Sequence, residues 1–320
     1  MRDGAALVNG SRTGRILLTG ADRRSYLQGL LTNDVEALRP GTGCYAALLT
    51  AQGRMITDMR VLELGDGVLL DVPAELTSSI RDHLDRFVIT EDVTVEDVSA
   101  QRGEIGLYGP RAVEVLAAAG TDGGVPGELF ESTRDRIAGA EVLIVRSDAP
   151  GVRGFDLVAA AANVPAIEAA LLAAGAVRAS DADVETVRIE SGHPRFGVDM
   201  DTDTIPLEAG LETRAISRTK GCYVGQEVIV RVLDRGHGRV ARRLVGLTLP
   251  AEAALPAAGT NVRAGAKEAG RVTSAVFSPA LARPIALAYL HRDFVEPGTH
   301  VQIDGSGDAV VTALPLVPLQ

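Results

Sequence analysis

Tryptophan is absent from this 320-residue chain, and aromatic residues as a whole make up only 3% of it. Hydrophobic cores must therefore be built from aliphatic side chains, and platforms of aromatic rings for stacking nucleic-acid bases are poorly supplied. Positive charge is also short, since 32 Lys and Arg residues face 42 Asp and Glu residues and leave a net charge of −10. This balance argues against stable nucleic-acid binding and against attachment to an anionic membrane.

Only two cysteines occur, which is too few for a disulfide scaffold or for a cysteine-based zinc or iron–sulfur site within one chain. Cys44, at the start of a predicted strand, is interpreted as a core thiol. The five histidines show no HxxxH or HExxH spacing, so we predict no metal site. No apolar run approaches the ~20 residues that span a bilayer, and the N-terminus lacks the layout of a signal peptide. We expect a soluble, cytoplasmic protein with free thiols.

The hydrophobic pattern changes along the chain. In the first part, short strands such as "RILLTG" and hairpins such as "CYAALLTAQGRMITDMRVLEL" alternate with helices, which favours an α+β fold over a doubly wound sheet. From Arg239 onward, short β segments with Gly and Pro punctuation follow one another without a convincing long helix. We therefore predict two domains, 1–238 and 239–320. Neither GxGxxG after a strand nor GxxxxGK[ST] occurs, so nothing indicates a Rossmann or P-loop nucleotide site.

The stretch "TKGCYVGQEVIV" (219–230) holds the second cysteine, Cys222, in a glycine-rich segment. A helix is predicted from Gly225 to Gly236, so the thiol would stand just before a helix N-terminus and close to Lys220. A positive helix end and a lysine both favour the thiolate. The alternative is a small buried residue in a glycine-rich turn, because free cysteines are usually buried. Local sequence leaves both interpretations open.

Two carboxylates stand in unusual positions. Asp58 lies in the middle of an apolar strand, on the same face as Arg60, where a carboxylate is costly unless it is paired. It is exposed on a sheet face, paired with Arg60 or a neighbour, or part of a ligand site. Glu190 lies near the C-terminal end of its helix, where the macrodipole disfavours negative charge. Its expected partner is Arg188, Arg195 or a ligand that presents N–H donors, with a surface salt bridge as the simplest case.

Several segments together resemble the folate-binding superfamily of the glycine-cleavage aminomethyltransferase (T-protein). The likeness lies in "YLQGLLTNDV", "YAALLTAQGRMITDMRV", "RIESGHPRFGVDMD", "TIPLEAGL" and "GRVTSAVFSPALARPIALAYL". The segment "KGCYVGQE" matches the K-G-C-Y-x-G-Q-E signature of the YgfZ branch, which includes mitochondrial iron–sulfur assembly factors, and the transferase lacks this signature. The resemblance covers nearly the whole chain and implies a three-domain cloverleaf of antiparallel sheets, helices and a C-terminal β-barrel.

The resemblance also implies roles for individual residues. Glu190 matches the glutamate that grips the pterin ring, Asp58 the aspartate near the reactive folate nitrogens, and Tyr45 a tyrosine of the same pocket. Asp71 departs from the pattern, because it lies where the transferase has an asparagine. The residues on the YgfZ signature are Lys220, Gly221, Cys222, Tyr223, Gly225, Gln226 and Glu227.

On this resemblance we expect a protein that binds tetrahydrofolate or a one-carbon derivative and supports assembly or repair of iron–sulfur enzymes, including those that modify tRNA. Iron–sulfur enzymes or assembly proteins are its expected partners. Cys222 would act as an accessible thiolate, while Lys220 would favour that thiolate and attract the anionic tail of the folate. One alternative is a tetrahydrofolate-dependent aminomethyl- or methyltransferase in which Asp58 moves a proton or stabilises charge. Another is a binding module whose site is only structural.

Overall fold

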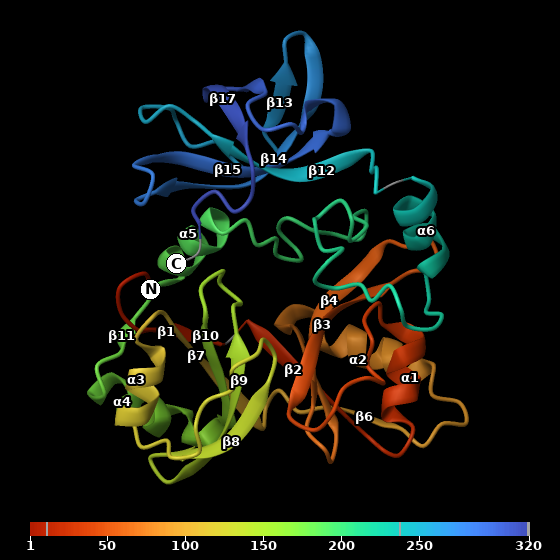
Figure 1. Ribbon diagram of the computed structural model, residues 1–320, viewed down its shortest axis with the longest axis vertical. Helices are drawn as coiled ribbons and strands as arrows, with labels where there is room; N and C mark the ends of the chain where they lie inside the picture. The colour runs from red at the N-terminus through yellow and green to blue at the C-terminus, as the bar shows by residue number, and fades with distance from the viewer. Residues whose placement is uncertain (11, 237, 319–320) are drawn as a thin grey trace. The chain divides into compact units, whose positions relative to one another are not determined.

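The chain divides into two compact units, each made of three segments (Figure 1). The computed structural model describes residues 1–10, 12–236 and 238–318. Unit 1 comprises Met1–Leu49, Thr57–Ser180 and Arg214–Val224, and unit 2 comprises Thr50–Ile56, Asp181–Thr213 and Gly225–Gln320. Each unit therefore joins segments that are far apart in the sequence.

Unit 1 is built on two sheets that are antiparallel except where β1 pairs with β11. The six-stranded sheet has the order β11-β1-β7-β10-β9-β8. Its strands are β1 (Ala6–Asn9), β7 (Arg102–Tyr108), β8 (Ser132–Ile137), β9 (Ala140–Ser147), β10 (Gly154–Ala160) and β11 (Val177–Arg178). The five-stranded sheet has the order β3-β4-β5-β2-β6. Its strands are β2 (Thr13–Thr19), β3 (Thr42–Leu49), β4 (Met55–Glu63), β5 (Val68–Pro73) and β6 (Thr94–Asp97).

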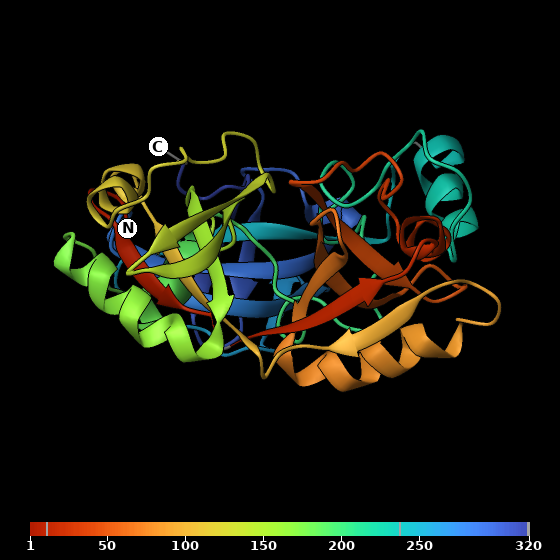
Figure 2. The same cartoon turned by 90° about the horizontal axis from the view of Figure 1, so that it is seen from below.

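Four α-helices accompany these sheets: α1 (Arg23–Leu30), α2 (Thr77–Arg86), α3 (Ala112–Ala118) and α4 (Val164–Ala173). Val115 and Leu116 of α3 and Ile167 and Leu171 of α4 are buried in one core with residues of the six-stranded sheet, such as Phe155. Each such side chain contributes roughly 1.5–3 kcal/mol when it is fully buried. Figure 2 shows α2 running beside β6 of the other sheet.

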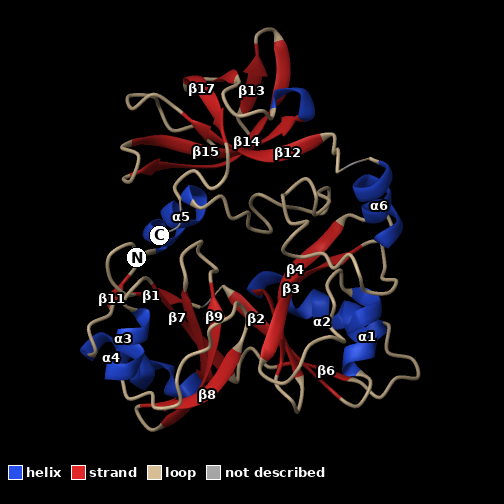
Figure 3. Ribbon diagram, viewed as in Figure 1, coloured by secondary structure: helices blue, strands red, loops and turns tan. Residues whose placement is uncertain are grey.

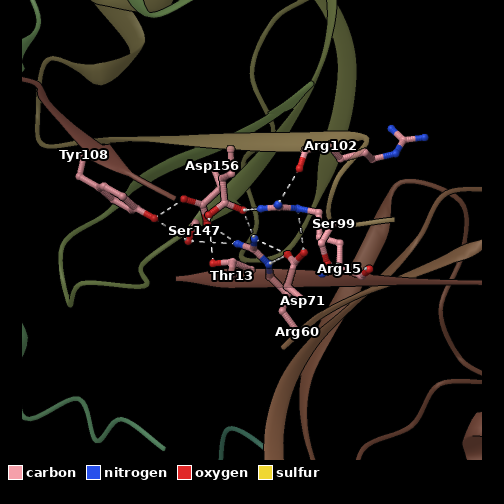
Figure 4. A network of polar contacts seen from close by, with 10 residues as sticks. Thr13, Arg15, Arg60, Asp71, Ser99, Arg102, Tyr108, Ser147 and Asp156 are labelled. Atoms are coloured by element: carbon pink, nitrogen blue, oxygen red, sulfur yellow. Dashed lines mark hydrogen bonds and ion pairs between the residues drawn. The ribbon is translucent and has the colours of Figure 1, made fainter. Parts of the chain in front are cut away.

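A buried network of charged side chains joins the two sheets of unit 1 (Figure 4). Arg15, Asp71 and Arg60 form a row across β2, β5 and β4, because Asp71 is in register with both arginines. From the other sheet, Glu104 accepts hydrogen bonds from Arg15 at 2.7 Å and from Arg60 at 3.2 Å. Asp156 also accepts a hydrogen bond from Arg60. Two arginines thus face three carboxylates, and each of the five side chains is at most 10% exposed.

Unit 2 combines helices α5 (Asp181–Glu190) and α6 (Gln226–Val230) with a closed six-stranded barrel, seen in red in Figure 3. The barrel order is β12-β15-β14-β13-β16-β17, and closure leaves the sheet without free edges. Its strands are β12 (Arg242–Thr248), β13 (Asn261–Ala264), β14 (Lys267–Ser278), β15 (Arg283–His291), β16 (His300–Ile303) and β17 (Gly307–Thr312). The predicted α+β class with a C-terminal β-barrel is confirmed.

The helix predicted from Gly225 begins at Gln226, but its second half, Arg231–Arg235, is π-helical rather than α-helical. The hydrophobic pattern could not distinguish these two forms of helix. Within the described ranges, no helix is long and apolar enough to cross a membrane.

Candidate active site

Tyr45 and Asp58 form a hydrogen-bonded pair on neighbouring strands of the five-stranded sheet. The Tyr45 hydroxyl on β3 donates to the Asp58 carboxylate on β4, and both residues are partly exposed. Among the residues that the structure describes, Tyr45 is the one side chain that hydrogen-bonds this carboxylate. Arg60, its neighbour on the same face, hydrogen-bonds to Asp71 and Asp156 and is therefore not the partner of Asp58.

Burial sets the protonation of this pair. Burial raises the pKa of Asp58, although the hydrogen bond from Tyr45 and the charge of Arg214 oppose the rise. Burial and the adjacent Asp58 charge raise the pKa of Tyr45 well above its usual value. The phenol therefore stays protonated as a donor, while the carboxylate is moved toward the neutral range in which general acids and bases work.

Arg214 completes the cluster, and no local sequence signal pointed to it. Its guanidinium carbon lies 5.2 Å from the centre of the Tyr45 ring. Its two terminal nitrogens donate to the carboxylate of Asp148, at 2.8 and 2.5 Å. Residues 45, 58, 148 and 214 are scattered along the chain, so only the folded structure brings them together.

The segment Arg214–Val224, which carries most of the cysteine signature, is fixed to the end of α1. The Lys220 ammonium donates to the carbonyl oxygens of Gln28, Leu31 and Asn33, at 2.7, 2.5 and 3.0 Å. These carbonyls belong to a helix end and the turn beyond it, where acceptors lack helical partners. An ammonium has three donors, and all three are used here. Burial lowers the pKa of Lys220 to about 8.

The two thiols differ in exposure. Cys222 is exposed, whereas its neighbours Lys220 and Tyr223 are buried and lie 5.0 Å apart, measured from the lysine nitrogen to the ring centre. Cys44 on β3 is partly buried, and burial raises the pKa of its thiol to about 12. The structure therefore presents Cys222 to solvent on an anchored segment and keeps Cys44 protonated.

The remaining signature residues mark the passage into α6. Gly221 is exposed, and Gly225 adopts a φ of 83°, in the left-handed region that favours glycine. Gln226 and Glu227 are the first two residues of α6. The backbone angle of Gly225 explains why this position is a glycine. The positions of Gly221, Gln226 and Glu227 do not assign these residues a chemical role.

Glu190 is the last residue of α5 in unit 2, as the sequence predicted. It is 1% exposed, and its Oε1 atom accepts a hydrogen bond from the Ser278 hydroxyl of β14 at 2.5 Å. Arg188, one of the partners expected for it, donates to Glu185 and Asp199. The hydroxyl of Ser278 is thus a partner of Glu190 that the sequence did not reveal.

Comparison with known proteins matches both parts of the chain. Residues 1–220 match the GCVT N-terminal domain, and residues 242–318 match the glycine cleavage T-protein C-terminal barrel domain. The aminomethyltransferase of Saccharopolyspora erythraea is 31% identical, with 98% of this chain and 87% of the relative covered. That of Geobacillus kaustophilus is 30% identical, with coverage of 99% and 88%. The crystal structure of glycine cleavage system aminomethyltransferase T from Bartonella henselae superposes with a TM-score of 0.86 at 25% identity, covering 99% and 87%.

The fold is therefore the mixed α+β fold of T-proteins, with antiparallel sheets and a closed C-terminal barrel. This chain belongs to the glycine-cleavage T-protein (GCVT) family. The superfamily predicted from sequence is confirmed. The relatives named here are aminomethyltransferases, so they support the transferase alternative better than the iron–sulfur interpretation.

Proposed function

We propose that this protein is a tetrahydrofolate-dependent transferase of the aminomethyltransferase type, with Tyr45 and Asp58 at the reacting site. The observation that carries the proposal is the partly exposed tyrosine–aspartate pair, in a chain that is similar to aminomethyltransferases along almost its whole length. A carboxylate with a raised pKa suits an amine substrate, because it accepts a proton or stabilises a developing positive charge.

A partly exposed carboxylate suits a reduced folate, because the folate presents N–H donors. Bound tetrahydrofolate would supply the nitrogens that receive the one-carbon unit. Asp58 would accept a hydrogen bond from one of them, and Tyr45 would hold the carboxylate in place. For Glu190 the pterin-binding role stays a prediction of the resemblance, because its carboxylate is 1% exposed and accepts a hydrogen bond from Ser278. For Lys220 the tail-binding role stays a prediction, because its three donors are engaged by carbonyls.

The test is a transfer assay with purified protein, tetrahydrofolate and a carrier-bound aminomethyl donor, in which methylenetetrahydrofolate and ammonia are measured. We expect turnover by the parent, a loss of about 10²–10⁴-fold in Asp58→Asn, and near-parental turnover in Cys222→Ser. A parent that binds tetrahydrofolate without turnover would reject the transferase role. A Cys222→Ser variant as inactive as Asp58→Asn would place the thiol in the reaction and reject this assignment.

As a second candidate we propose a YgfZ-type folate-binding protein that supports iron–sulfur enzymes, including tRNA-modifying ones. The exposed Cys222 within "KGCYVGQE" favours it. Complementation of a deletion strain, read out as iron–sulfur enzyme activity, tests it: we expect rescue by the parent and none by Cys222→Ser. Equal rescue by both would remove the thiol from the function.

The two thiols provide an internal control for that candidate. Alkylation followed against pH should modify Cys222 first. At pH 8, a thiol with a pKa of about 12 holds about 10³-fold less thiolate than a free cysteine with a pKa of ~8.5, so Cys44 should lag. Mass spectrometry of the two peptides measures the ratio, and equal rates would contradict the exposure difference.

We also propose that residues 1–238 form the folate-binding core and residues 239–320 the barrel domain. The family matches to 1–220 and 242–318 support this division. A cytoplasmic location is part of the same proposal. Limited proteolysis tests the boundary, with first cleavage expected near residue 239.

A further inference from the structure

Arg214 is a cation that contacts the Tyr45 ring and acts electrostatically on both Tyr45 and Asp58. Its side chain is held in a fixed orientation. Its Nη1 and Nη2 atoms donate to Oδ2 and Oδ1 of Asp148, and such a two-point contact fixes the plane of a guanidinium. The side chains of Arg214 and Asp148 are 27% and 17% exposed. Solvent therefore weakens the field of this cation without removing it.

The guanidinium also rests against two aromatic rings. Its central carbon lies 5.2 Å from the ring centre of Tyr45 and 5.7 Å from that of Phe130, both within the range of cation–π attraction. Because the Tyr45 hydroxyl donates to Asp58, a cation at this ring acts on the phenol and on the carboxylate together.

The backbone around Arg214 is positioned by the same elements that position Tyr45. The Asn33 amide donates to the carbonyl of Tyr45 at 2.8 Å and to that of Arg214 at 3.3 Å. Next to it, the Thr32 hydroxyl donates to the carbonyl of Ala215 at 2.6 Å. The distance between the arginine and the tyrosine is thus set through the backbone as well as through Asp148.

The charges that face the pair come from several elements. Arg60 on β4 donates hydrogen bonds to Asp71 and Asp156, not to Asp58. Arg214, from the segment that packs on α1, lowers the pKa of Asp58 against the effect of burial. Asp148, which follows β9, acts in the opposite direction on Tyr45. Arg214 is therefore the cation whose charge favours the carboxylate form of Asp58, against the larger effect of burial.

We infer that Arg214, held by Asp148, is a positioning residue: it holds the Tyr45 ring so that its hydroxyl is directed at Asp58, and its positive charge favours the carboxylate form of Asp58. The expected effect of Arg214 on turnover rests on the proposed function, whereas its expected effect on the Tyr45–Asp58 pair does not. A purely structural role is the alternative, in which the Arg214–Asp148 pair only fastens the segment that carries Cys222.

Tyrosine fluorescence separates the two roles without any ligand. The chain has five tyrosines and no tryptophan, so tyrosine emission is unobscured. A hydrogen-bonded carboxylate quenches this emission more than a carboxylic acid does. The difference between each protein and its Tyr45→Phe counterpart, followed against pH, therefore reports the protonation of Asp58.

Removal of the cation should raise the midpoint of this titration. Arg214→Met is expected to move it upward by about one pH unit or more, because an opposite charge nearby lowers a carboxyl pKa by 1–3 units. Arg214→Gln keeps amide donors for Asp148 and should show the same upward shift. Arg23→Met is the matched control: Arg23 donates to Glu63 at 3.2 Å in the same unit, so its loss should lower stability and leave the midpoint unchanged.

An unchanged midpoint in a folded Arg214→Met or Arg214→Gln variant overturns the inference and leaves only a fastening role. A shift of equal size in Arg23→Met also overturns it. With a transferase assay in hand, the acid limb of kcat/KM should move upward by the same amount in both Arg214 variants. If the protein shows no turnover, the proposed function fails while the fluorescence midpoint still decides the role of Arg214.

Discussion

Among the described residues of unit 1, two tyrosine–aspartate pairs each have an arginine beside them, and their surroundings differ. Tyr108 donates to Asp156, the two residues are 2% and 3% exposed, and Arg60 bonds the same carboxylate directly. Tyr45 donates to Asp58 in the same way, but this pair is partly exposed and its arginine acts through the ring rather than on the carboxylate.

This difference in exposure and in arginine contact indicates that one tyrosine–aspartate pair is structural and that the other can bind a ligand. Each carboxylate oxygen of Asp156 accepts a hydrogen bond inside the buried network, one from Tyr108 and one from Arg60, so Asp156 helps to join the two sheets. Asp58 accepts a hydrogen bond from one described side chain, Tyr45, and is partly exposed, so its carboxylate retains capacity to accept further hydrogen bonds. Removing a partner from a buried ion pair leaves an uncompensated charge, whereas a partly exposed carboxylate is hydrated instead. Substitutions should therefore lower stability more at the buried pair than at the partly exposed pair.

The largest contrast is expected from truncating the two aspartates. Asp156→Ala removes the carboxylate acceptor of both Arg60 Nη1 and the Tyr108 hydroxyl in the interior. At about 1–3 kcal/mol for each buried donor left unsatisfied, the free energy of unfolding should fall by about 2–6 kcal/mol. Asp58→Ala should lower it by less than about 1 kcal/mol, as for partly solvated sites. Urea denaturation measures both, with the exposed Asp308→Ala as the control. Equal losses at positions 156 and 58 would break the comparison.

A smaller contrast is expected from the tyrosines. Tyr108→Phe leaves the buried Asp156 without its phenolic donor and should cost about 1–3 kcal/mol of stability. Tyr45→Phe removes a hydrogen bond at a partly exposed site, where water replaces it, so the loss should be smaller. The same unfolding experiment measures both changes. A larger loss for Tyr45→Phe would show that its hydrogen bond is the structural one.

The third prediction concerns the pH dependence of the buried network. Burial, and then the charge of Asp156, raises the pKa of Glu104 to about 7, above the ordinary value of 4.5. The folded state then binds more protons than the unfolded state between these values, so the stability due to this group is full below pH 4.5 and is lost as the pH rises through 7. Glu104→Gln should abolish this slope. Unfolding free energies at pH 5 and pH 8 test it, and an unchanged slope would contradict it.

Much of the fold followed from pattern alone. The strands containing Cys44 and Asp58, the helix after Asp22, and the strand-rich C-terminal part were predictable because their apolar residues repeat with the period of a strand or helix. The π-helical turn Arg231–Arg235 was not, since it shares the side-chain pattern of an α-helix.

The site was predictable only in part. Asp58 and Tyr45 were identified by resemblance, but the partner of Asp58 was left open between Arg60 and other groups. Arg60 bonds Asp71 because the strand register places these two residues opposite each other. The register cannot be predicted from the sequence of one strand alone. Arg214 could not be found in advance because its contacts depend on the packing of a distant segment.

Tetrahydrofolate binding measured by calorimetry is the most direct test of the central claim, that the partly exposed pair at Asp58 is the ligand site and the buried pair at Asp156 is structural. We predict that the parent binds and that Asp58→Asn weakens binding by about tenfold or more, the loss of one hydrogen bond to a charged group. The folded fraction of Asp156→Asn should bind as the parent does. Equal affinity of the parent and Asp58→Asn, or no binding by the parent, would contradict this account.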